Sequence, residues 1–331
     1  MASLYVTDCE GPITLDDNAF ELCAHFIPDG AGFFTKISEY DDYLADVEKR
    51  PGYKAGDTLR LILPFLIAFG ADNKTVEEYS EKHVVLVPGA DKTLRFVSEN
   101  MHARIVSTSY EPYIKALCRK TGFPFDNTYC TKLDLDKEIK DVKDIKEIDE
   151  VKEIKEEIDA LKGPITDILK DLDNIFFKRL PEMKMGIVFQ HVDPVGGKKK
   201  ADALMDSLEK TGIPGEQTIY VGDSITDVQA FQAVKDAGGL AVSFNGNRYA
   251  IEVADIALIS ENTDVLTYVA DSFLEGGKEE VFKLLHAWDM NIIEAVEIPR
   301  AAIVEQRNMK ELIKESEAMR RKIRGMAGAL G

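Results

Sequence analysis

Short apolar runs, each followed by a segment with helical spacing, recur along the chain. The expected strands are Leu4–Val6, Arg104–Val106, Thr218–Val221, Leu240–Ser243 and Ile256–Ile259. Apolar runs of this kind are typical of strands that are buried on both faces of a parallel sheet. Strands that alternate with helices predict an α/β fold, in which ligands bind beyond the carboxyl ends of the strands. The polar residues directly after each run are therefore the first candidates for a site.

The stretch between the first two runs is far longer than one crossover helix needs. Its first part, 15–82, has helical character and is followed by the turn signal Pro88-Gly89, which predicts a helical cap inserted into the core. A second insertion is expected at 137–185, and the C-terminal part, 263–331, is expected to be a helical extension. The core domain is then discontinuous and consists of 1–14, 83–136 and 186–262.

The second insertion opens with a charged tract, Lys137–Lys162, in which every residue is either charged or apolar. Apolar side chains recur there at every third position: Ile139, Val142, Ile145, Ile148, Val151 and Ile154. On a helix this stripe winds around the cylinder, so a single flat interface cannot bury all of it. Two interpretations follow: a mobile lid or partner-binding helix, or a solvated helical arm that packs on the other insertion.

Composition and charge narrow the class of protein. The 331 residues include 59 acidic and 41 basic side chains, which gives a formal charge of -18. A nucleic-acid binder needs a basic face, so no nucleic-acid partner is expected. The longest apolar stretch, Leu59–Ala71, is too short for a membrane span and contains Pro64, so no membrane insertion is expected. Four cysteines without a CxxC pair, and no secretory segment, favour a cytoplasmic globular protein.

The C-terminal end is basic although the chain is acidic. Four cations precede Gly325, namely Arg320, Arg321, Lys322 and Arg324. Cations stabilise the negative end of a helix dipole, which is the simpler interpretation. The alternative is a docking site for an acidic protein partner, and the charged tract is a second candidate site for such a partner.

The first candidate for chemistry is LYVTDCEGPIT, where an apolar strand runs into Asp8, Glu10 and Gly11. An aspartate at a strand end can attack phosphorus and form an aspartyl-phosphate, which divides one difficult displacement into two easier steps. A carboxylic acid two residues later can protonate the leaving oxygen and then deprotonate the hydrolytic water. Gly11 allows the chain to turn sharply after these residues.

Two further motifs supply groups that suit a phosphate. In ARIVSTSYEPYIKAL, the Ser107 hydroxyl follows a strand and can bind a phosphoryl oxygen, and Thr108 can add a backbone N–H group at a helix start. In GGKKKADALMDSL, a lysine at the opening of a helix can neutralise the nucleophile and the phosphoryl charge. Lys200 is favoured, because the KADAL pattern points it at the sheet, and Lys199 is the alternative.

The fourth motif, TIYVGDSITDVQAF, is the most specific. A strand, a tight glycine turn and the aspartates Asp223 and Asp227 make a hard-oxygen site that suits Mg²⁺. Asp223 is the expected metal ligand, and Asp227 is expected to hold a metal-bound water or the lysine. Asn245 in SFNGN ends a later strand; it either contacts the substrate or is an ordinary turn residue.

In this order, Asp8, Ser107, Lys200 and the Asp223/Asp227 pair closely resemble the four motifs of the haloacid dehalogenase (HAD) superfamily. The resemblance covers the core from Leu4 to about Ile259. It implies a Rossmann-like three-layer core with a parallel sheet, Mg²⁺-dependent phosphoryl transfer, and cap insertions that set the choice of substrate.

The resemblance also implies a role for each matching residue. Asp8 would be the nucleophile and Glu10 the acid/base, while Ser107 and Lys200 would bind phosphate. Asp8, the backbone carbonyl of Glu10 and Asp223 would hold the metal. Glu10 departs from the usual pattern, in which this position is an aspartate, and so does Pro12, where a threonine commonly follows the glycine.

The opening sequence DCEGPITLDDNAFEL is also similar to archaeal HAD proteins associated with energy-converting hydrogenases, of the subunit R type. That similarity implies an archaeal setting and no particular substrate. We therefore expect a Mg²⁺-dependent phosphatase that acts on a small phosphorylated metabolite. The alternatives are a phosphotransferase or mutase that uses the same residues, and a catalytically weak HAD-fold accessory subunit of a larger complex.

Overall fold

The computed structural model describes residues 2–140, 145–288 and 299–330. At its centre is a seven-stranded sheet with the strand order β3-β2-β1-β4-β5-β6-β7. The strands are β1 (Leu4–Thr7), β2 (His102–Tyr110), β3 (Thr128–Thr131), β4 (Thr218–Gly222), β5 (Leu240–Phe244), β6 (Ile256–Ile259) and β7 (Arg300–Ile303). All neighbouring strands are parallel except β6 and β7. The predicted α/β fold class is confirmed.

The helices connect these strands and build the insertions. In chain order the α-helices are α1 (Asn18–Phe26), α2 (Gly30–Asp42), α3 (Thr58–Leu61), α4 (Leu63–Ala68), α5 (Asn73–His83), α6 (Ala90–Asn100), α7 (Glu111–Thr121), α8 (Leu135–Lys140), α9 (Ile145–Ala160), α10 (Ile165–Asn174), α11 (Leu180–Glu182), α12 (Val188–His191), α13 (Lys198–Thr211), α14 (Val228–Asp236), α15 (Arg248–Val253), α16 (Asp264–His286) and α17 (Met309–Arg324). Short 3₁₀ and π segments are η1 (Tyr43–Val47), η2 (Phe125–Asn127), η3 (Ile175–Arg179), η4 (Lys184–Ile187), η5 (Gly215–Gln217), η6 (Ile225–Asp227) and η7 (Ala327–Ala329).

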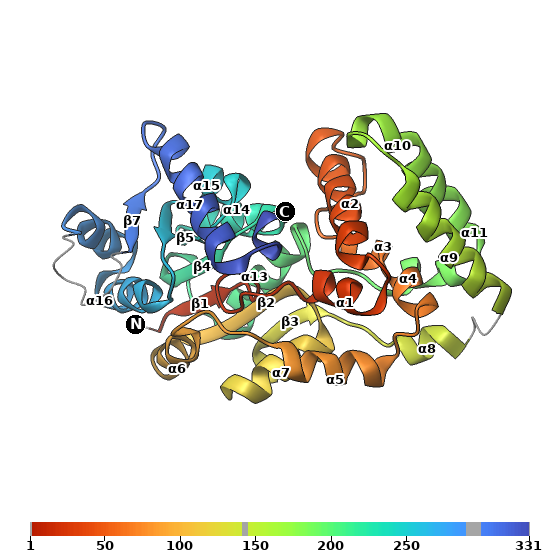
Figure 1. Ribbon diagram of the computed structural model, residues 1–331. Helices are drawn as coiled ribbons and strands as arrows, with labels where there is room; N and C mark the ends of the chain where they lie inside the picture. The colour runs from red at the N-terminus through yellow and green to blue at the C-terminus, as the bar shows by residue number, and fades with distance from the viewer. Residues whose placement is uncertain (1, 141–144, 289–298, 331) are drawn as a thin grey trace.

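The core has three layers because both faces of the sheet are apolar. In β1, Tyr5 belongs to an apolar cluster with residues of α6, α7 and α16, whereas Leu4 and Val6 belong to a second cluster with residues of α13, α14 and α15. Alternate residues of a strand point to opposite faces, so each face needs its own helices. Figure 1 shows the core on one side of the molecule and the inserted helices on the other.

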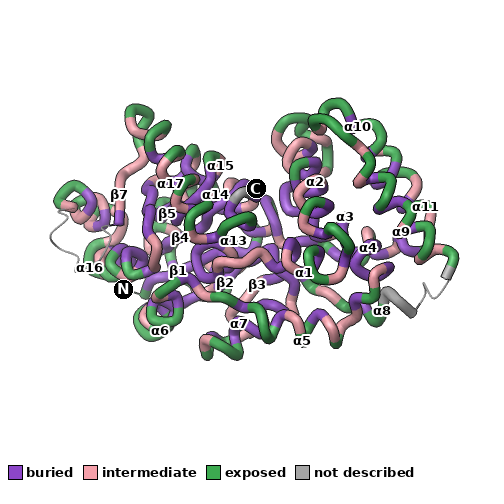
Figure 2. Tube along the Cα trace, viewed as in Figure 1, coloured by how far each residue is buried: buried purple, intermediate pink, exposed green. Residues whose placement is uncertain are grey.

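Both insertions pack together into one cap. Phe33 and Phe65 from the first insertion and Ile154 and Phe176 from the second belong to the same apolar cluster. The ring centroids of Phe65 and Phe176 are 6.2 Å apart. Figure 2 shows buried residues along the inward sides of the cap helices and exposed residues along their outer sides.

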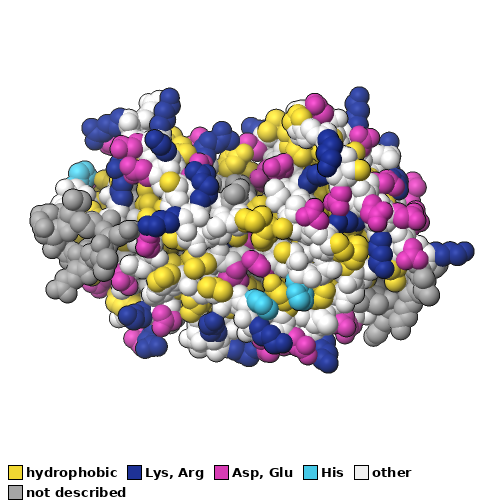
Figure 3. Space-filling model, viewed as in Figure 1, with side chains coloured by type: hydrophobic (Ala, Val, Ile, Leu, Met, Phe, Trp, Pro, Cys, Tyr) yellow, Lys and Arg dark blue, Asp and Glu magenta, His cyan; other side chains and the backbone are white. Residues whose placement is uncertain are grey.

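Part of the charged tract is packed against the first insertion. In α9, Val151, Ile154 and Ile158 are buried, and the helix contacts α2 and α4. The outer surface of this part of the cap carries many acidic side chains (Figure 3). These contacts agree with an arm packed on the other insertion. Residues 141–144, which include Val142 of the predicted stripe, lie outside the described residues.

The C-terminal part contains a strand, although the sequence predicted helix throughout. In β7, Arg300 lies opposite Ile259 and Ile303 lies opposite Ile256, so the segment adds an antiparallel edge to the sheet. Its four residues are only half-buried and carry no strand pattern of their own; pairing with β6 makes them a strand. Residues 289–298 of the predicted extension lie outside the described residues. The last residues that the structure describes lie between the core and the cap helices (Figure 1).

Within the described residues, no helix combines the length and the apolar character needed to span a bilayer.

Candidate active site

The carboxyl ends of β1 and β4 bring Asp8 and Asp223 together. The two strands are parallel neighbours, and the N–H of Asp8 donates to the carbonyl oxygen of Val221 (2.8 Å), so strand pairing continues up to Asp8 itself. Asp8 is 4% exposed and Asp223 is 2% exposed. Buried carboxylates require cations or several hydrogen-bond donors nearby.

Lys200 supplies the cation for Asp8. Its Nζ lies 2.5 Å from Asp8 Oδ2 and 2.8 Å from Asp227 Oδ1, and its side chain is fully buried. Lys199, the alternative phosphate-binding lysine, has a half-exposed side chain that pairs with Asp193. The structure therefore places Lys200 at the carboxyl ends of the central strands, beside Asp8, whereas Lys199 points to the surface.

Asp227 holds the lysine and shapes the loop after β4. Its Oδ1 accepts hydrogen bonds from Lys200 and from the hydroxyl of Tyr220 (2.9 Å). Its Oδ2 accepts hydrogen bonds from the backbone N–H groups of Asp223 (3.0 Å) and Ser224 (3.1 Å). With four donors on its two oxygens, Asp227 fits the lysine-holding role better than that of a metal ligand.

The surroundings shift the pKa values of this pair. Burial raises the pKa of Asp8 to about 8, while the adjacent Lys200 opposes that increase. Burial would lower the pKa of Lys200, but the negative charges of Asp227 and Asp8 outweigh it and raise that pKa. The lysine therefore stays charged and stabilises the anionic form of Asp8, the form that can act as a nucleophile.

The Glu10 side chain is held by hydrogen bonds to one of its two carboxyl oxygens. Oε1 accepts hydrogen bonds from the backbone N–H of Asn18 (2.8 Å) and from the hydroxyl of Ser109 (2.7 Å). No described residue donates a hydrogen bond to Oε2. Burial, followed by the negative charge of Asp17, raises the pKa of Glu10 well above its ordinary value. A carboxyl group of this kind retains its proton and can donate it.

Of the two hydroxyl residues predicted to bind phosphate, the structure places Thr108 at the cavity and Ser107 behind it. The hydroxyl of Ser107 donates to the hydroxyl of Ser109 (2.9 Å), and Ser107 is fully buried. Thr108 lines the cavity described below and donates to the carbonyl oxygen of Val195 (3.2 Å). Ser107 thus supports Ser109, which in turn binds Glu10.

Asp8, Asp223 and Asp227 offer carboxylate oxygens that all lie within 4.8 Å of one another. Hard oxygen donors suit Mg²⁺, so the donor set fits this ion. Gly11 has a φ of +93°, and a side chain at this position would collide with the Asp223 carboxylate. The first and fourth motifs therefore meet in close contact.

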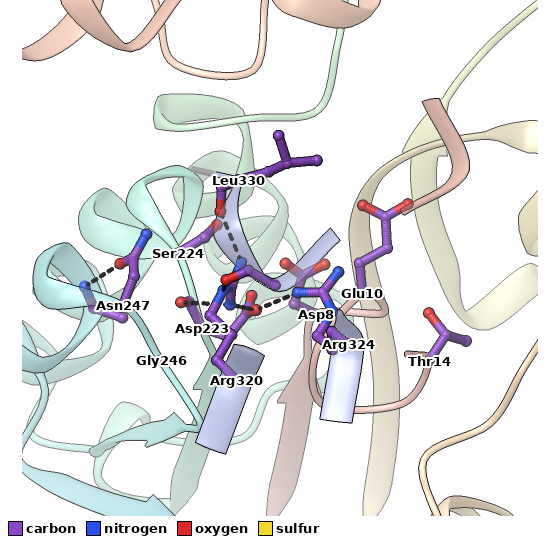
Figure 4. A network of polar contacts seen from close by, with 12 residues as sticks. Asp8, Glu10, Thr14, Asp223, Ser224, Gly246, Asn247, Arg320, Arg324 and Leu330 are labelled. Carbon is purple, nitrogen blue, oxygen red and sulfur yellow. Dashed lines mark hydrogen bonds and ion pairs between the residues drawn. The ribbon is translucent and has the colours of Figure 1, made fainter. Parts of the chain in front are cut away.

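Two arginines that the sequence did not assign to the site bind Asp223. Arg320 and Arg324 of α17 both donate to Asp223 Oδ2, the latter at 3.1 Å, and both are buried (Figure 4). The expected roles of these arginines, dipole stabilisation or partner docking, do not account for these contacts. The exposed cations of this helix end are Arg321 and Lys322.

Asn245 has the turn role and lies outside the set of described residues that line the cavity. Its amide nitrogen donates to the carbonyl oxygen of Ser260 (2.7 Å), and its Oδ1 accepts from the N–H of Ser260 (2.9 Å). Its φ of +47° is one that asparagine tolerates. The side chain joins the ends of β5 and β6, as expected from the turn interpretation.

A cavity lies between the core and the cap. Its core side includes Asp8, Glu10, Thr108 and Asp223, and its cap side includes Phe34, Ser38, Asp41, Asp42 and Thr58. The cap side thus combines hydroxyl and carboxyl groups with an aromatic ring. A small polar molecule could reach the carboxylates of the core from here.

Asp42 lies on the cap wall among like charges. Burial, followed by the negative charges of Asp41, Asp46 and Glu39, raises its pKa from 3.8 to about 8. Tyr249 of α15 also interacts with its charge. Since the folded protein holds this proton more tightly than the unfolded chain does, stability falls as the pH rises from the unfolded pKa to the folded one.

Replacement of Asp42 by asparagine is therefore expected to raise the thermal midpoint. The gain should be small at about pH 4 and largest above about pH 8, where it should exceed ~1 kcal/mol, roughly the value of one pKa unit. Thermal melts at both pH values test this. Asp271→Asn, at an exposed position within α16, is the control and should change little. An equal shift at both pH values would contradict the expectation.

Comparison with known proteins defines the class of fold. No family model matches the chain. Two phosphoserine phosphatase structures, a phospho-aspartyl intermediate analogue and a substrate complex, are similar with TM-scores of 0.51 at 16% and 18% identity, each over 81% of this chain and 98% of that one. A segment of 70 residues, 21% of this chain, is 36% identical to phosphoserine phosphatase SerB2 from Mycobacterium tuberculosis, and it spans 16% of that protein's length. The chain has the fold of phosphoserine phosphatase.

A more similar protein matches the whole chain. Gene product AF1437 from Archaeoglobus fulgidus has a TM-score of 0.89 and 34% identity, over 100% of this chain and 99% of that one. The chain belongs to the same family as this archaeal protein, and its fold is the one that the HAD-like motifs predicted.

Proposed function

We propose that the protein is a Mg²⁺-dependent phosphatase that hydrolyses a small phosphorylated metabolite through an aspartyl-phosphate on Asp8. The observation that carries this proposal is the buried ion pair of Asp8 with Lys200, which Asp227 also binds; this pair lies next to Glu10 and opens to the cavity. It supplies a nucleophile, a cation and an acid within one site. The similarity to HAD phosphatases supports the same class of reaction.

In the first step, an Asp8 oxygen forms a bond to phosphorus while the bond from phosphorus to the leaving oxygen breaks. The N–H of Cys9 (2.6 Å from Asp8 Oδ1) and Lys200 orient the Asp8 carboxylate. Glu10 gives its proton to the leaving oxygen, which departs as an alcohol. In the second step, the Glu10 carboxylate takes a proton from water, and the resulting hydroxide attacks phosphorus and releases Asp8.

Asp8 and Asp223, with the backbone carbonyl of Glu10, would hold the Mg²⁺. When bound, the ion would offset the negative charge of the phosphoryl oxygens. Lys200 contributes positive charge at Asp8 Oδ2, and Thr108 lines the same cavity. The polar cap wall of the cavity favours a small polar substrate.

A second candidate function is that of a catalytically weak accessory subunit. The contact of Arg320 and Arg324 with Asp223 favours it, because these cations lie on a predicted metal ligand. A phosphotransferase or mutase would use the same residues and would differ only in the acceptor, a hydroxyl group in place of water.

Phosphate release from a panel of phosphorylated metabolites tests the proposal. With Mg²⁺ we expect release from at least one small phosphate ester, and excess EDTA should reduce the rate at least ~100-fold, a typical loss when one stabilising charge is removed. Added Mg²⁺ should restore it. Transfer to an added alcohol would identify a phosphotransferase. If no ester of the panel released phosphate, the accessory-subunit function would be favoured.

The compartment is also part of the proposal. All four cysteines are free and buried, which is usual in a reducing cytoplasm. The full-length similarity to an archaeal protein supports an archaeal setting.

A further inference from the structure

The buried face of α17 ends in two arginines. Leu312, Ser316, Arg320 and Arg324 follow one another at every fourth position and are all buried. Residues four apart lie on the same side of a helix, so the arginines continue the stripe that begins with Leu312. Leu312 packs in an apolar cluster with Ile251 of α15, whereas the arginines extend into the active site.

Arg320 joins the chain end to the fourth motif. Its Nη1 donates to the carboxylate of Asp223 and to the carbonyl oxygen of the same residue (3.2 Å). Its Nε donates to the carbonyl oxygen of Gly328 (3.2 Å), and its Nη2 donates to that of Leu330 (3.1 Å). Leu330 in turn lines the cavity. A single guanidinium therefore fixes both a predicted metal ligand and the end of the chain.

Arg324 joins the same carboxylate to the start of the cap. Its Nη1 lies 3.1 Å from Asp223 Oδ2. Its Nε donates to the carbonyl oxygen of Leu15 (2.9 Å), and its Nη2 donates to that of Asp16 (3.3 Å). Leu15 and Asp16 lead from the first motif into α1, so this arginine connects the core and the cap at the catalytic centre.

Both guanidinium groups bind Oδ2 of Asp223, and no described residue donates a hydrogen bond to Oδ1. The carboxylate is thus held by one oxygen while the other is left for a further ligand. Two guanidinium groups also carry the same total charge as one Mg²⁺. Charges this close repel each other strongly in a buried site, where water screens them poorly.

We propose that Arg320 and Arg324 are positioning residues of the catalytic centre: they hold Asp223 and set the local charge so that a divalent cation binds tightly only together with a phosphate group. This proposal rests on the proposed function. Without phosphate, the arginines repel the cation. A phosphate dianion supplies the negative charge that offsets this repulsion, so cation and phosphate strengthen each other's binding.

Titration of the full-length protein with Mn²⁺, followed by electron paramagnetic resonance, tests the proposal without any turnover. Inorganic phosphate at saturation should lower the wild-type dissociation constant for Mn²⁺ at least ~10-fold. In Arg324→Met and Arg320→Met, Mn²⁺ alone should bind at least ~10-fold more tightly than in the wild type. Phosphate should then increase the affinity for Mn²⁺ by a smaller factor than it does in the wild type. Methionine retains much of the apolar length of the side chain.

Arg321→Met is the matched control, because Arg321 lies on the same helix with a side chain that is 57% exposed. Its affinity for Mn²⁺ should equal that of the wild type. If the two buried variants also bind Mn²⁺ no more tightly than the wild type, the proposal is wrong, although the phosphatase could still be active. If neither the wild type nor the variants bind Mn²⁺, both the proposal and the metal-dependent function fail.

A second measurement uses only the wild type, in case a variant does not fold. Hydrogen exchange of the amides in 317–330 is compared with and without Mg²⁺. Because binding linkage is reciprocal, a cation that the arginines repel must also weaken their hold on Asp223. Exchange should therefore become at least ~3-fold faster with Mg²⁺ alone and return towards its original rate when phosphate is added. Unchanged or slower exchange with Mg²⁺ alone would overturn the proposal.

Discussion

Replacement of Asp8 by asparagine should abolish phosphate release, with a loss of at least ~10⁴-fold, and should leave the protein folded. The amide is a poor nucleophile, and it cannot form the acyl phosphate that the two-step displacement needs. The fold should tolerate the change, since burial already raises the pKa of Asp8 to about 8 and a neutral group of the same shape is easily accommodated.

Steady-state phosphate release on the best substrate of the panel, together with circular dichroism and a thermal melt, measures both effects. Asp91→Asn is the matched control, because Asp91 is exposed in the first turn of α6. It should retain full activity. If Asp8→Asn released phosphate at the wild-type rate, the nucleophile would have to be another group.

Replacement of Lys200 by methionine should weaken both stability and activity. Lys200 is fully buried and pairs with Asp8 and Asp227. Removing one partner of a buried ion pair leaves uncompensated charge and typically costs about 3–5 kcal/mol. The phosphoryl group would also lose a nearby cation, which should slow phosphate release at least ~100-fold.

Thermal melts and phosphate release of the Lys200→Met and Lys199→Met proteins check this prediction. Lys199 is adjacent in sequence, but its side chain is 40% exposed and pairs with Asp193 at the surface. A surface ion pair contributes about 0–1 kcal/mol, so Lys199→Met should melt close to the wild type and remain active. A larger loss of activity in Lys199→Met than in Lys200→Met would mean that the wrong lysine has been placed in the site.

The parallel core could be predicted because its strands carry their own signal. Leu4–Thr7 and Thr218–Gly222 are fully buried, and a strand buried on both faces must consist mainly of apolar residues. The edge strands Thr128–Thr131 and Arg300–Ile303 are partly exposed and could not be found in this way. Their strand character comes from pairing with β2 and β6, which a local pattern does not contain.

The candidate site shows the same division. Two of its residues, Asp8 and Asp223, directly follow strands, and Lys200 lies in the first turn of a helix. Ligands of a parallel sheet bind beyond the carboxyl ends of its strands, so the sequence could predict that these residues lie close together. The sequence could not predict that the Ser107 hydroxyl binds Ser109 and lies away from the cavity. This depends on the directions in which two hydroxyl groups of the same strand point.

Arg320 and Arg324 could not be assigned, since Arg320 lies 97 residues and Arg324 lies 101 residues from Asp223 along the chain. One signal was available: they continue a helical stripe that begins with Leu312, so they occupy positions expected to be buried. A buried cation needs an anionic partner, and the site contains several carboxylates.

The most direct test of the central claim is to look for the phosphoryl group on Asp8. The protein is incubated with Mg²⁺ and either acetyl phosphate or the best substrate of the panel, and the reaction is stopped in acid. Peptide mass spectrometry, with borohydride reduction of the acyl phosphate, then locates the modified residue. The account predicts a phosphoryl group on Asp8 that is absent from Asp8→Asn. Phosphate release without modification of Asp8, or with the group on another residue, would contradict it.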